Sequence, residues 1–214
     1  MFRFDNRSVL LAQSLEELPW LEHGFGTRAS TDWPPPAGLA TVKQIHSNTV
    51  LVADHPGVIG EGDALITNRP GITLAIRTAD CVPILIADPR NRAVAAVHSG
   101  WRGTVLEIAP ETVRAMQDRF GSRPEELVVV VGPGIGGCCF EVGPEVAAQF
   151  GLSGRTKIDL AETLRRQMGR NDGTPGQFAS AGMCTVCRAD LFHSYRRDRE
   201  AAGRMVSVIG IRES

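Results

Sequence analysis

The sequence predicts a mixed α/β (α+β) domain whose core is a largely antiparallel β-sheet flanked by helices. Three observations lead to this prediction. Five short apolar runs rich in β-branched residues are bounded by Gly, Pro, Asp or Asn, as strands are. A five-residue turn joins two of these runs and is too short for a helical crossover. Three later segments have helical spacing or the residues that begin helices.

The predicted strands occupy the middle of the chain. They are TVLVA (49–53), ITLAI (72–76), VPILIA (82–87), AVAAVH (93–98) and LVVVVG (127–132). Because these runs are continuously apolar, they indicate strands covered on both faces. The turn DPRNR makes the third and fourth strands an antiparallel hairpin, so Cys81 and His98 should lie at the same end of it.

Three helices are predicted after this hairpin. TVLEIAPETVRAMQDRFG (104–121) has apolar residues at helical spacing, and its Pro110 marks a new turn or a kink. GPEVAAQFG (143–151) and IDLAETLRRQMGRN (158–171) are the other two, the last with Asp159 as its N-cap. No linker or internal repeat divides the sequence, so we expect residues 1–214 to form a single domain.

Composition argues against two classes of function, nucleic-acid binding and membrane insertion. With 43% hydrophobic and 22% charged residues and a net charge of -1, the chain is typical of a globular protein and offers no broad attraction for nucleic acid or anionic membranes. No apolar run approaches the roughly 18 residues of a membrane span. The odd count of five cysteines favours reduced thiols or metal ligands over a disulfide framework. We therefore expect a cytoplasmic protein, and the sequence is compatible with a monomer.

Two histidines and one cysteine form the first candidate site. His46 precedes the strand at 49–53, His98 ends the strand at 93–98, and Cys81 precedes its hairpin partner. Two imidazoles and a thiolate suit zinc, and three protein ligands leave a fourth position open for water or substrate. The spacing is not that of a zinc finger, so scattered core and loop residues remain the alternative on spacing alone.

Four further cysteines carry weaker signals. Cys184 and Cys187 have the C-x2-C spacing of a zinc knuckle or redox site, but no second such pair or His pair follows them, which favours two thiols in a loop. Cys138 and Cys139 follow a predicted strand in the Gly-rich segment GPGIGGCCFEVG. That segment is either a tight turn or a loop whose N–H groups face an anion.

Arginines and carboxylates near these positions extend the candidate site. Arg28, Arg102 and Arg196 lie in loop-like segments beside Gly, aromatic or Ser residues, and a guanidinium can bind phosphate or carboxylate through two hydrogen bonds. Asp63 in EGDALIT and Asp80 beside Cys81 are carboxylates that could orient a histidine ligand.

These residues also carry a family resemblance. The chain resembles the YfiH-like, laccase-domain family, also called polyphenol-oxidase-like purine nucleoside phosphorylases. The resemblance spans residues 23–210, and its matching segments are HGFGTR, VKQIHSNTV, GDALIT, PGITLAIRTADCVPILIAD, VAAVHSGWRGT, VGPGIGGCCFEVG, CTVCRADLFHSYRRD and GRMVSVIG. It implies a Zn²⁺ site of His46, Cys81 and His98 as the catalytic centre.

The resemblance also implies an activity. It points to phosphorolysis of adenosine, inosine and S-methyl-5′-thioadenosine, with hydrolytic deamination of adenosine, so purine nucleosides and phosphate are the expected partners. We expect Arg28, Asp63, Arg102, Cys139 and Arg196 to bind substrate, with Trp101 and Phe140 as walls that stack a purine. Multicopper oxidation needs several histidine-rich sites, which five histidines cannot supply.

Three alternatives stay open. Some members of the family are linked to editing of cell-wall precursors, as amidases that remove L-Ser from UDP-MurNAc-L-Ser. Cys81 with His98 as base would instead give a metal-free thiol amidohydrolase. A zinc-stabilised interaction module without catalysis would need a closed site of four ligands.

Overall fold

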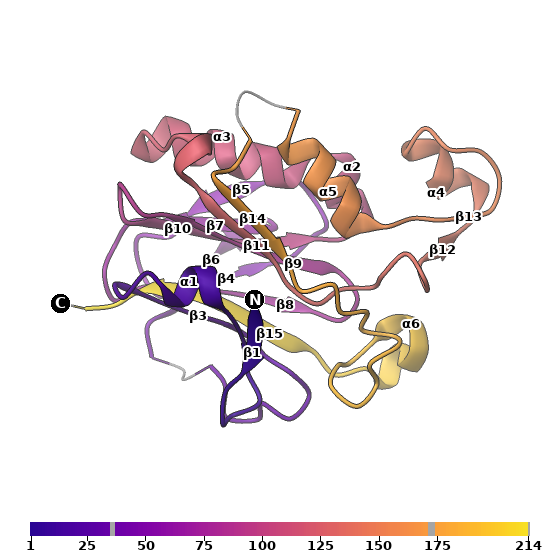
Figure 1. The fold of residues 1–214 in the computed structure, drawn as a ribbon, viewed down its shortest axis with the longest axis horizontal. Coiled ribbons are helices and arrows are strands. Elements are labelled where there is room, and N and C mark those ends of the chain that lie inside the picture. Colours follow the sequence, from indigo (N-terminus) through magenta and orange to yellow (C-terminus); the bar gives the residue numbers. More distant parts are fainter. Residues whose placement is uncertain (35–36, 171–173, 214) are drawn as a thin grey trace.

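Two large β-sheets lie face to face, and helices cover the outer face of one of them (Figure 1). This arrangement is seen in a computed structural model that describes residues 1–34, 37–170 and 174–213. Among these residues, no helix combines the length and apolar character needed to cross a membrane.

The first sheet has seven strands and contains both ends of the described chain. It is antiparallel from β1 to β8, and the last two pairings, β8 with β4 and β4 with β6, are parallel. In spatial order its strands are β1 (Phe2–Phe4), β2 (Leu10–Ala12), β3 (Leu21–Phe25), β15 (Met205–Ile211), β8 (Thr73–Thr78), β4 (Leu39–Lys43) and β6 (Gly57–Glu61).

The second sheet has six strands and carries the predicted hairpin at its centre. Its inner pairings are antiparallel, and the two edge pairings, β14 with β11 and β7 with β5, are parallel. Its strands in order are β14 (Gln177–Ser180), β11 (Val128–Val131), β9 (Val82–Asp88), β10 (Ala93–Ser99), β7 (Ala64–Thr67) and β5 (Val50–Val52). A small separate sheet pairs β12 (Glu141–Val142) with β13 (Thr156–Lys157).

The helices are short, except for one on the outer face of the second sheet. They are α1 (Gln13–Glu16), α2 (Trp101–Val105), α3 (Ile108–Phe120), α4 (Pro144–Gln149), α5 (Leu160–Met168) and α6 (Tyr195–Asp198), with 3₁₀ turns η1 (Pro124–Glu126) and η2 (Arg199–Ala201). Figure 1 shows α2, α3 and α5 above the second sheet, while α4 stands apart beside β12 and β13.

Alternate side chains of the central strands fill two different cores. In β9, Ile84 and Ile86 face the helices, whereas Leu85 faces the first sheet, and all three are fully buried. The period-2 alternation of a strand explains this split. A strand with a core on each face must be apolar at every position, which is why VPILIA and AVAAV show no polar alternation.

The structure confirms the predicted α+β class and its five strands, although the sheets are mixed where antiparallel pairing was expected throughout most of the core. Parallel pairs lie at both edges of the second sheet and on one side of the first, where β8, β4 and β6 are neighbours. The helix predicted over 104–121 is two helices: the chain breaks at Glu107, whose φ is 57°, and Pro110 lies in the first turn of α3. Asp159 caps α5 by accepting a hydrogen bond from the backbone N–H of Glu162 (3.0 Å), as predicted, and Asn171 of that segment lies outside the described residues.

The predicted antiparallel hairpin forms. β9 and β10 are antiparallel, with Ser99 opposite Val82 and His98 opposite Pro83. Cys81, the residue before β9, therefore lies beside the end of β10. One turn thus brings the cysteine and the histidine together, and both lie where the two central strands of the second sheet meet the same end of the sheet.

Candidate metal centre

The sheet register also brings a carboxylate to the end of β10. β7 pairs with β10 so that Ala64 is opposite Val97, and the backbone N–H of His98 donates to the carbonyl of Asp63 (2.7 Å). The imidazole Nδ1 of His98 lies 2.8 Å from Oδ1 of Asp63. Both side chains are buried, with relative exposures of 3% and 0%. This bond fixes the ring of His98 and leaves its Nε2 as the nitrogen that can bind a ligand.

His46 reaches the same place from the loop between β4 and β5. β5 lies parallel to β7 with Val50 beside Ala64, so the loop that leads into β5 passes next to Asp63. The carboxylate of Asp63 accepts backbone N–H groups of His46 (3.0 Å) and Ser47 (2.6 Å), and the Ser47 hydroxyl (2.8 Å). His46 has a φ of 61°, a left-handed conformation that costs a non-glycine residue roughly 1–3 kcal/mol unless its surroundings fix it. These hydrogen bonds supply that restraint.

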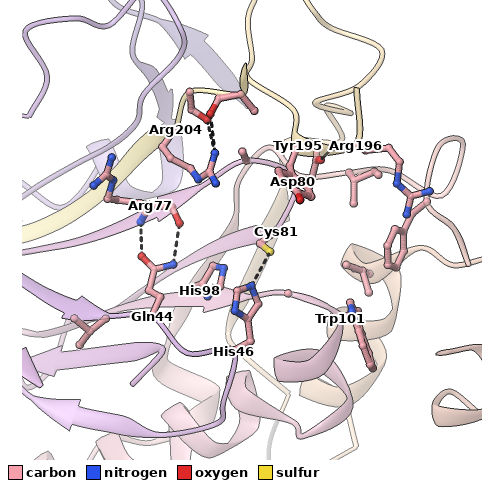
Figure 2. A pocket seen from close by; sticks show the side chains of 18 residues that line it. Gln44, His46, Arg77, Asp80, Cys81, His98, Trp101, Tyr195, Arg196 and Arg204 are labelled. Atoms are coloured by element: carbon pink, nitrogen blue, oxygen red, sulfur yellow. Dashed lines mark hydrogen bonds between the residues drawn. The ribbon is translucent and has the colours of Figure 1, made fainter. Parts of the chain in front are cut away.

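The three donor atoms converge. Ligand atoms of His46, Cys81 and His98 all lie within 4.8 Å of one another, and the Cys81 sulfur is 4.0 Å from Nε2 of His46. Figure 2 shows the two rings and the sulfur pointing toward one another. The rings meet edge to face, with centroids 4.9 Å apart.

Gly100 makes room for this arrangement. A Cβ at position 100 would lie 3.0 Å from the sulfur of Cys81 and 3.1 Å from Cδ2 of His46. Such contacts are tighter than ordinary van der Waals packing, so a side chain here would displace the donor atoms. The glycine in HSGW thus lets the three donor atoms lie this close without any shift of the cysteine or the histidine.

The surroundings of the cluster favour the charged forms of Asp63, Cys81 and His98. Burial works against the Cys81 thiolate, but hydrogen bonds with His46 and His98 lower the pKa of this thiol to about 7. Burial also opposes charge on His98, yet hydrogen bonds to Asp63 and Cys81 raise its pKa to about 9. The pKa of Asp63 falls to about 2 because the bonds from His98 and Ser47 outweigh its burial. A thiolate is therefore available near neutral pH, which is the form that binds metals.

This donor set fits a metal ion. Two imidazole nitrogens and one thiolate are ligands that Zn²⁺ prefers, and a carboxylate bonded to the non-ligating nitrogen of a histidine is the usual support of such a ligand. The bonded Asp63 and the absence of a side chain at Gly100 are features that an ordinary core histidine does not need. His46, Cys81 and His98 are thus the residues that could hold zinc.

The cluster opens into a cleft of about 840 Å³. Figure 2 shows Arg77 and Arg204 on one side of the cluster and Arg196 and Trp101 on the other. The cleft combines apolar walls with basic and aromatic groups, and its lining is Val42, Gln44, His46, Arg77, Ala79, Asp80, Cys81, His98, Gly100, Trp101, Ile135, Phe140, Leu160, Tyr195, Arg196, Ala202, Gly203 and Arg204.

The structure places three of the predicted substrate contacts near the centre. Arg196 lines the cleft; its guanidinium donates to the carbonyl of Glu141 (2.9 Å) and lies over the Phe140 ring at 5.4 Å. Asp63 faces His98 and the His46 loop instead of the cleft. Arg102 rests over the Trp101 ring at 4.5 Å, so it contacts a wall of the cleft without being one of the described residues that line it.

The other two lie elsewhere. The guanidinium of Arg28 donates to the carbonyl of Ala189 (2.6 Å). Cys139 belongs to a separate group of four cysteines. Neither is among the described residues that line the cleft.

Sequence reasoning missed Arg77, Arg204, Gln44 and Tyr195. The Gln44 side chain holds the backbone of Arg77, accepting its N–H and donating to its carbonyl, both at 2.8 Å. An arginine inside the apolar run ITLAIRT was the available signal for Arg77, since β8 has no other exposed residue. Asp80 orients no histidine: its carboxylate accepts the Thr185 hydroxyl (2.6 Å) and the backbone N–H of Arg196 (2.6 Å).

Comparisons with known proteins identify the family of this chain. Residues 27–212 match a family model described as multi-copper polyphenol oxidoreductase laccase. A purine nucleoside phosphorylase of Deinococcus radiodurans is 45% identical over 183 residues, which cover 81% of this chain and 70% of that protein. One of Clostridium acetobutylicum is 35% identical over 188 residues, covering 83% and 79%.

Solved structures show the same fold. A Bacillus licheniformis protein named YfiH superposes with a TM-score of 0.89 at 28% identity, covering 99% of both chains. YlmD from Geobacillus stearothermophilus gives the same TM-score and coverage at 27% identity. The chain therefore belongs to the laccase-like family that contains the YfiH and YlmD proteins.

Proposed function

We propose that this protein is a zinc-dependent purine nucleoside phosphorylase, acting on adenosine, inosine and S-methyl-5′-thioadenosine, that also deaminates adenosine. The observation that carries the proposal is the His46–Cys81–His98 cluster at the base of a cleft with aromatic and basic walls. The relatives named purine nucleoside phosphorylase support the choice of substrate. A cleft of about 840 Å³ lies within the range of small-molecule sites, which is roughly 300–1,000 Å³.

The zinc ligands in this proposal are His46, Cys81 and His98. When bound there, zinc would act as a Lewis acid toward a substrate oxygen and would lower the pKa of water toward about 7. Asp63 holds Nδ1 of His98 and the backbone of the His46 loop, so it keeps both imidazoles in position. Cys81 contributes a thiolate near neutral pH.

The walls of the cleft suit the purine and the phosphate that take part in phosphorolysis. In phosphorolysis, a phosphate oxygen forms a bond to C1′ of the ribose while the bond from C1′ to the purine breaks and its electron pair leaves with the base. Trp101 and Phe140 line the cleft, where an aromatic ring can pack against a purine, although an arginine already lies over each ring. Arg196, Arg77 and Arg204 can balance the charge of phosphate.

Deamination uses the same cleft with a different nucleophile. Water adds to C6 of adenosine and ammonia leaves, giving inosine. Because both reactions place one nucleoside in one cleft, a change that disturbs the three ligands should affect them together.

The free state of all five cysteines supports the expectation of a reducing compartment such as the cytoplasm.

Copper-laccase chemistry has less support than zinc chemistry. Multicopper oxidases require several histidine-rich sites. Here His23 uses its ring to accept the backbone N–H of Ala12 (2.9 Å), and among the described residues the groups that could share a metal contain only two histidines, both in the proposed zinc site.

The first prediction concerns metal content. His46→Ala or Cys81→Ala should reduce zinc by one equivalent per chain, because either change leaves only two of three ligands. His55→Ala is the matched control, since His55 is an exposed histidine outside the cluster. Elemental analysis of protein purified without chelator measures this. Full zinc in His46→Ala would remove the histidine from the site.

The second prediction isolates the role of Asp63. Asp63→Asn should weaken zinc binding by about 10–100-fold, because the amide carries no negative charge and its NH2 group, in place of one carboxylate oxygen, cannot accept the N–H and hydroxyl of Ser47 that hold the His46 loop. Chelator competition gives the dissociation constant. Asp88→Asn is the control, because Asp88 is an equally buried carboxylate that accepts hydrogen bonds from Arg90 and Asn91 in the β9–β10 turn. Equal affinities in the two variants would show that Asp63 does not support the metal.

The third prediction concerns phosphate. Arg196→Lys keeps the charge but loses the planar guanidinium, so the KM for phosphate should rise about tenfold, a loss of roughly 1.4 kcal/mol, while zinc stays bound. Arg102→Lys tests whether the arginine over Trp101 also contributes, and an unchanged KM would place it outside the site. Arg114→Lys, on the exposed face of α3, should behave as the wild type.

The fourth prediction concerns the reaction. Adenosine with inorganic phosphate should give adenine and ribose 1-phosphate, and adenosine in water alone should give inosine, as followed by liquid chromatography. His98→Ala should suppress both products, and His55→Ala should preserve both. If adenosine is unchanged with or without phosphate while UDP-MurNAc-L-Ser is cleaved, the nucleoside assignment is wrong and the amidase takes its place.

A further inference from the structure

Four cysteines from two distant segments meet outside the cleft. Cys138 and Cys139 lie in the loop after β11, and Cys184 and Cys187 lie in the loop after β14. Their four sulfur atoms are all within 4.8 Å of one another. β11 and β14 are parallel neighbours, so the loops that follow them start at the same end of this strand pair.

The distances between these sulfurs match metal coordination. The sulfur of Cys187 lies 3.6 Å from that of Cys138 and 3.4 Å from that of Cys139. Four sulfurs around a tetrahedral zinc, each at about 2.3 Å, are about 3.8 Å apart. A disulfide would instead need about 2.05 Å. The four thiols are therefore spaced as ligands of one ion.

The backbone around them is shaped to present the sulfurs. Gly136 donates its N–H to the sulfur of Cys184 (3.3 Å), a contact that stabilises negative charge on a thiolate. A Cβ at Gly136 would lie 3.2 Å from Cβ of Cys184 and 3.3 Å from the sulfur of Cys138. The Cys184–Cys187 segment closes as a turn, with Arg188 N–H bonded to the carbonyl of Cys184 (3.0 Å). The C-x2-C spacing of this turn is one that structural zinc sites use.

We propose that Cys138, Cys139, Cys184 and Cys187 bind a second zinc ion through four thiolates. Each thiol loses its proton to solvent when the ion binds, and no oxidant or reductant takes part. Four protein ligands close the coordination sphere, so this ion is structural. The proposal does not depend on the reaction proposed for the cleft.

The ion would stabilise one wall of the cleft. The two loops are already joined by the bridge between Gly134 and Cys184, and both reach Asp80, the residue before Cys81. Ile135 donates its N–H to the carbonyl of Asp80 (2.7 Å), and the Thr185 hydroxyl donates to its carboxylate (2.6 Å). Phe140, directly after the cysteine pair, lines the cleft. Zinc at the four cysteines would thus link the two loops that hold this wall.

Two variants test the proposal, and each removes ligands from only one of the two zinc sites. The wild type should contain about two zinc ions per chain. Cys81→Ala should retain one, and X-ray absorption at the zinc edge should show only sulfur neighbours at about 2.3 Å. The double variant Cys138→Ser/Cys187→Ser replaces the two exposed cysteines and should also retain one zinc, now with nitrogen neighbours and a single sulfur.

Three results would overturn the proposal. One is Cys81→Ala protein that is folded by circular dichroism and free of zinc. Another is a nitrogen-containing shell in that variant. The third is a disulfide among the four cysteines, seen by mass spectrometry of wild type purified anaerobically. If Cys81→Ala does not fold, the sulfur content of the wild-type zinc spectrum decides, because a protein with only the His46–Cys81–His98 zinc has one sulfur per ion.

Discussion

The carboxylate of Asp63 is the interaction on which the site depends. It is fully buried, and it accepts hydrogen bonds from the His98 ring, the His46 and Ser47 N–H groups and the Ser47 hydroxyl. Hydrogen bonds to a charged group contribute about 1.5–3 kcal/mol each, more than neutral ones. One side chain thereby fixes a strand-end histidine and a loop histidine relative to each other. The sheet register places it there, since Asp63 precedes β7 and β7 lies between β10 and β5.

The two cores explain why such a charged cluster can persist. The apolar faces of β9 and β10 pack against helices on one side and against the first sheet on the other, so every residue of the two strands is buried. The cleft lies beyond the ends of these strands, and its walls include residues of β4, β8, α2, α6 and the loop after β11.

The local part of this architecture could be predicted from the sequence. The five-residue turn was enough to place Cys81 beside His98, and Asp159 marked the start of α5. Pairings between strands far apart in the chain, such as β14 with β11 and β15 with β8, could not be predicted, because they leave no local pattern. For that reason Cys184 and Cys187 looked like an incomplete pair: their partners, Cys138 and Cys139, are brought close only by the pairing of β14 with β11. Arg204 was missed for the same reason.

Gly100 has a consequence for recognising active relatives. None of the three donor atoms belongs to it, yet a Cβ there would contact both the Cys81 sulfur and the His46 ring. A relative with a larger residue at this position would keep His, Cys and His in its sequence, but its cysteine sulfur or histidine ring would have to shift by a few tenths of an ångström to make room for the added Cβ. Among relatives that keep the three ligands, those that also have a glycine two residues after the second histidine therefore match the geometry of this centre most directly.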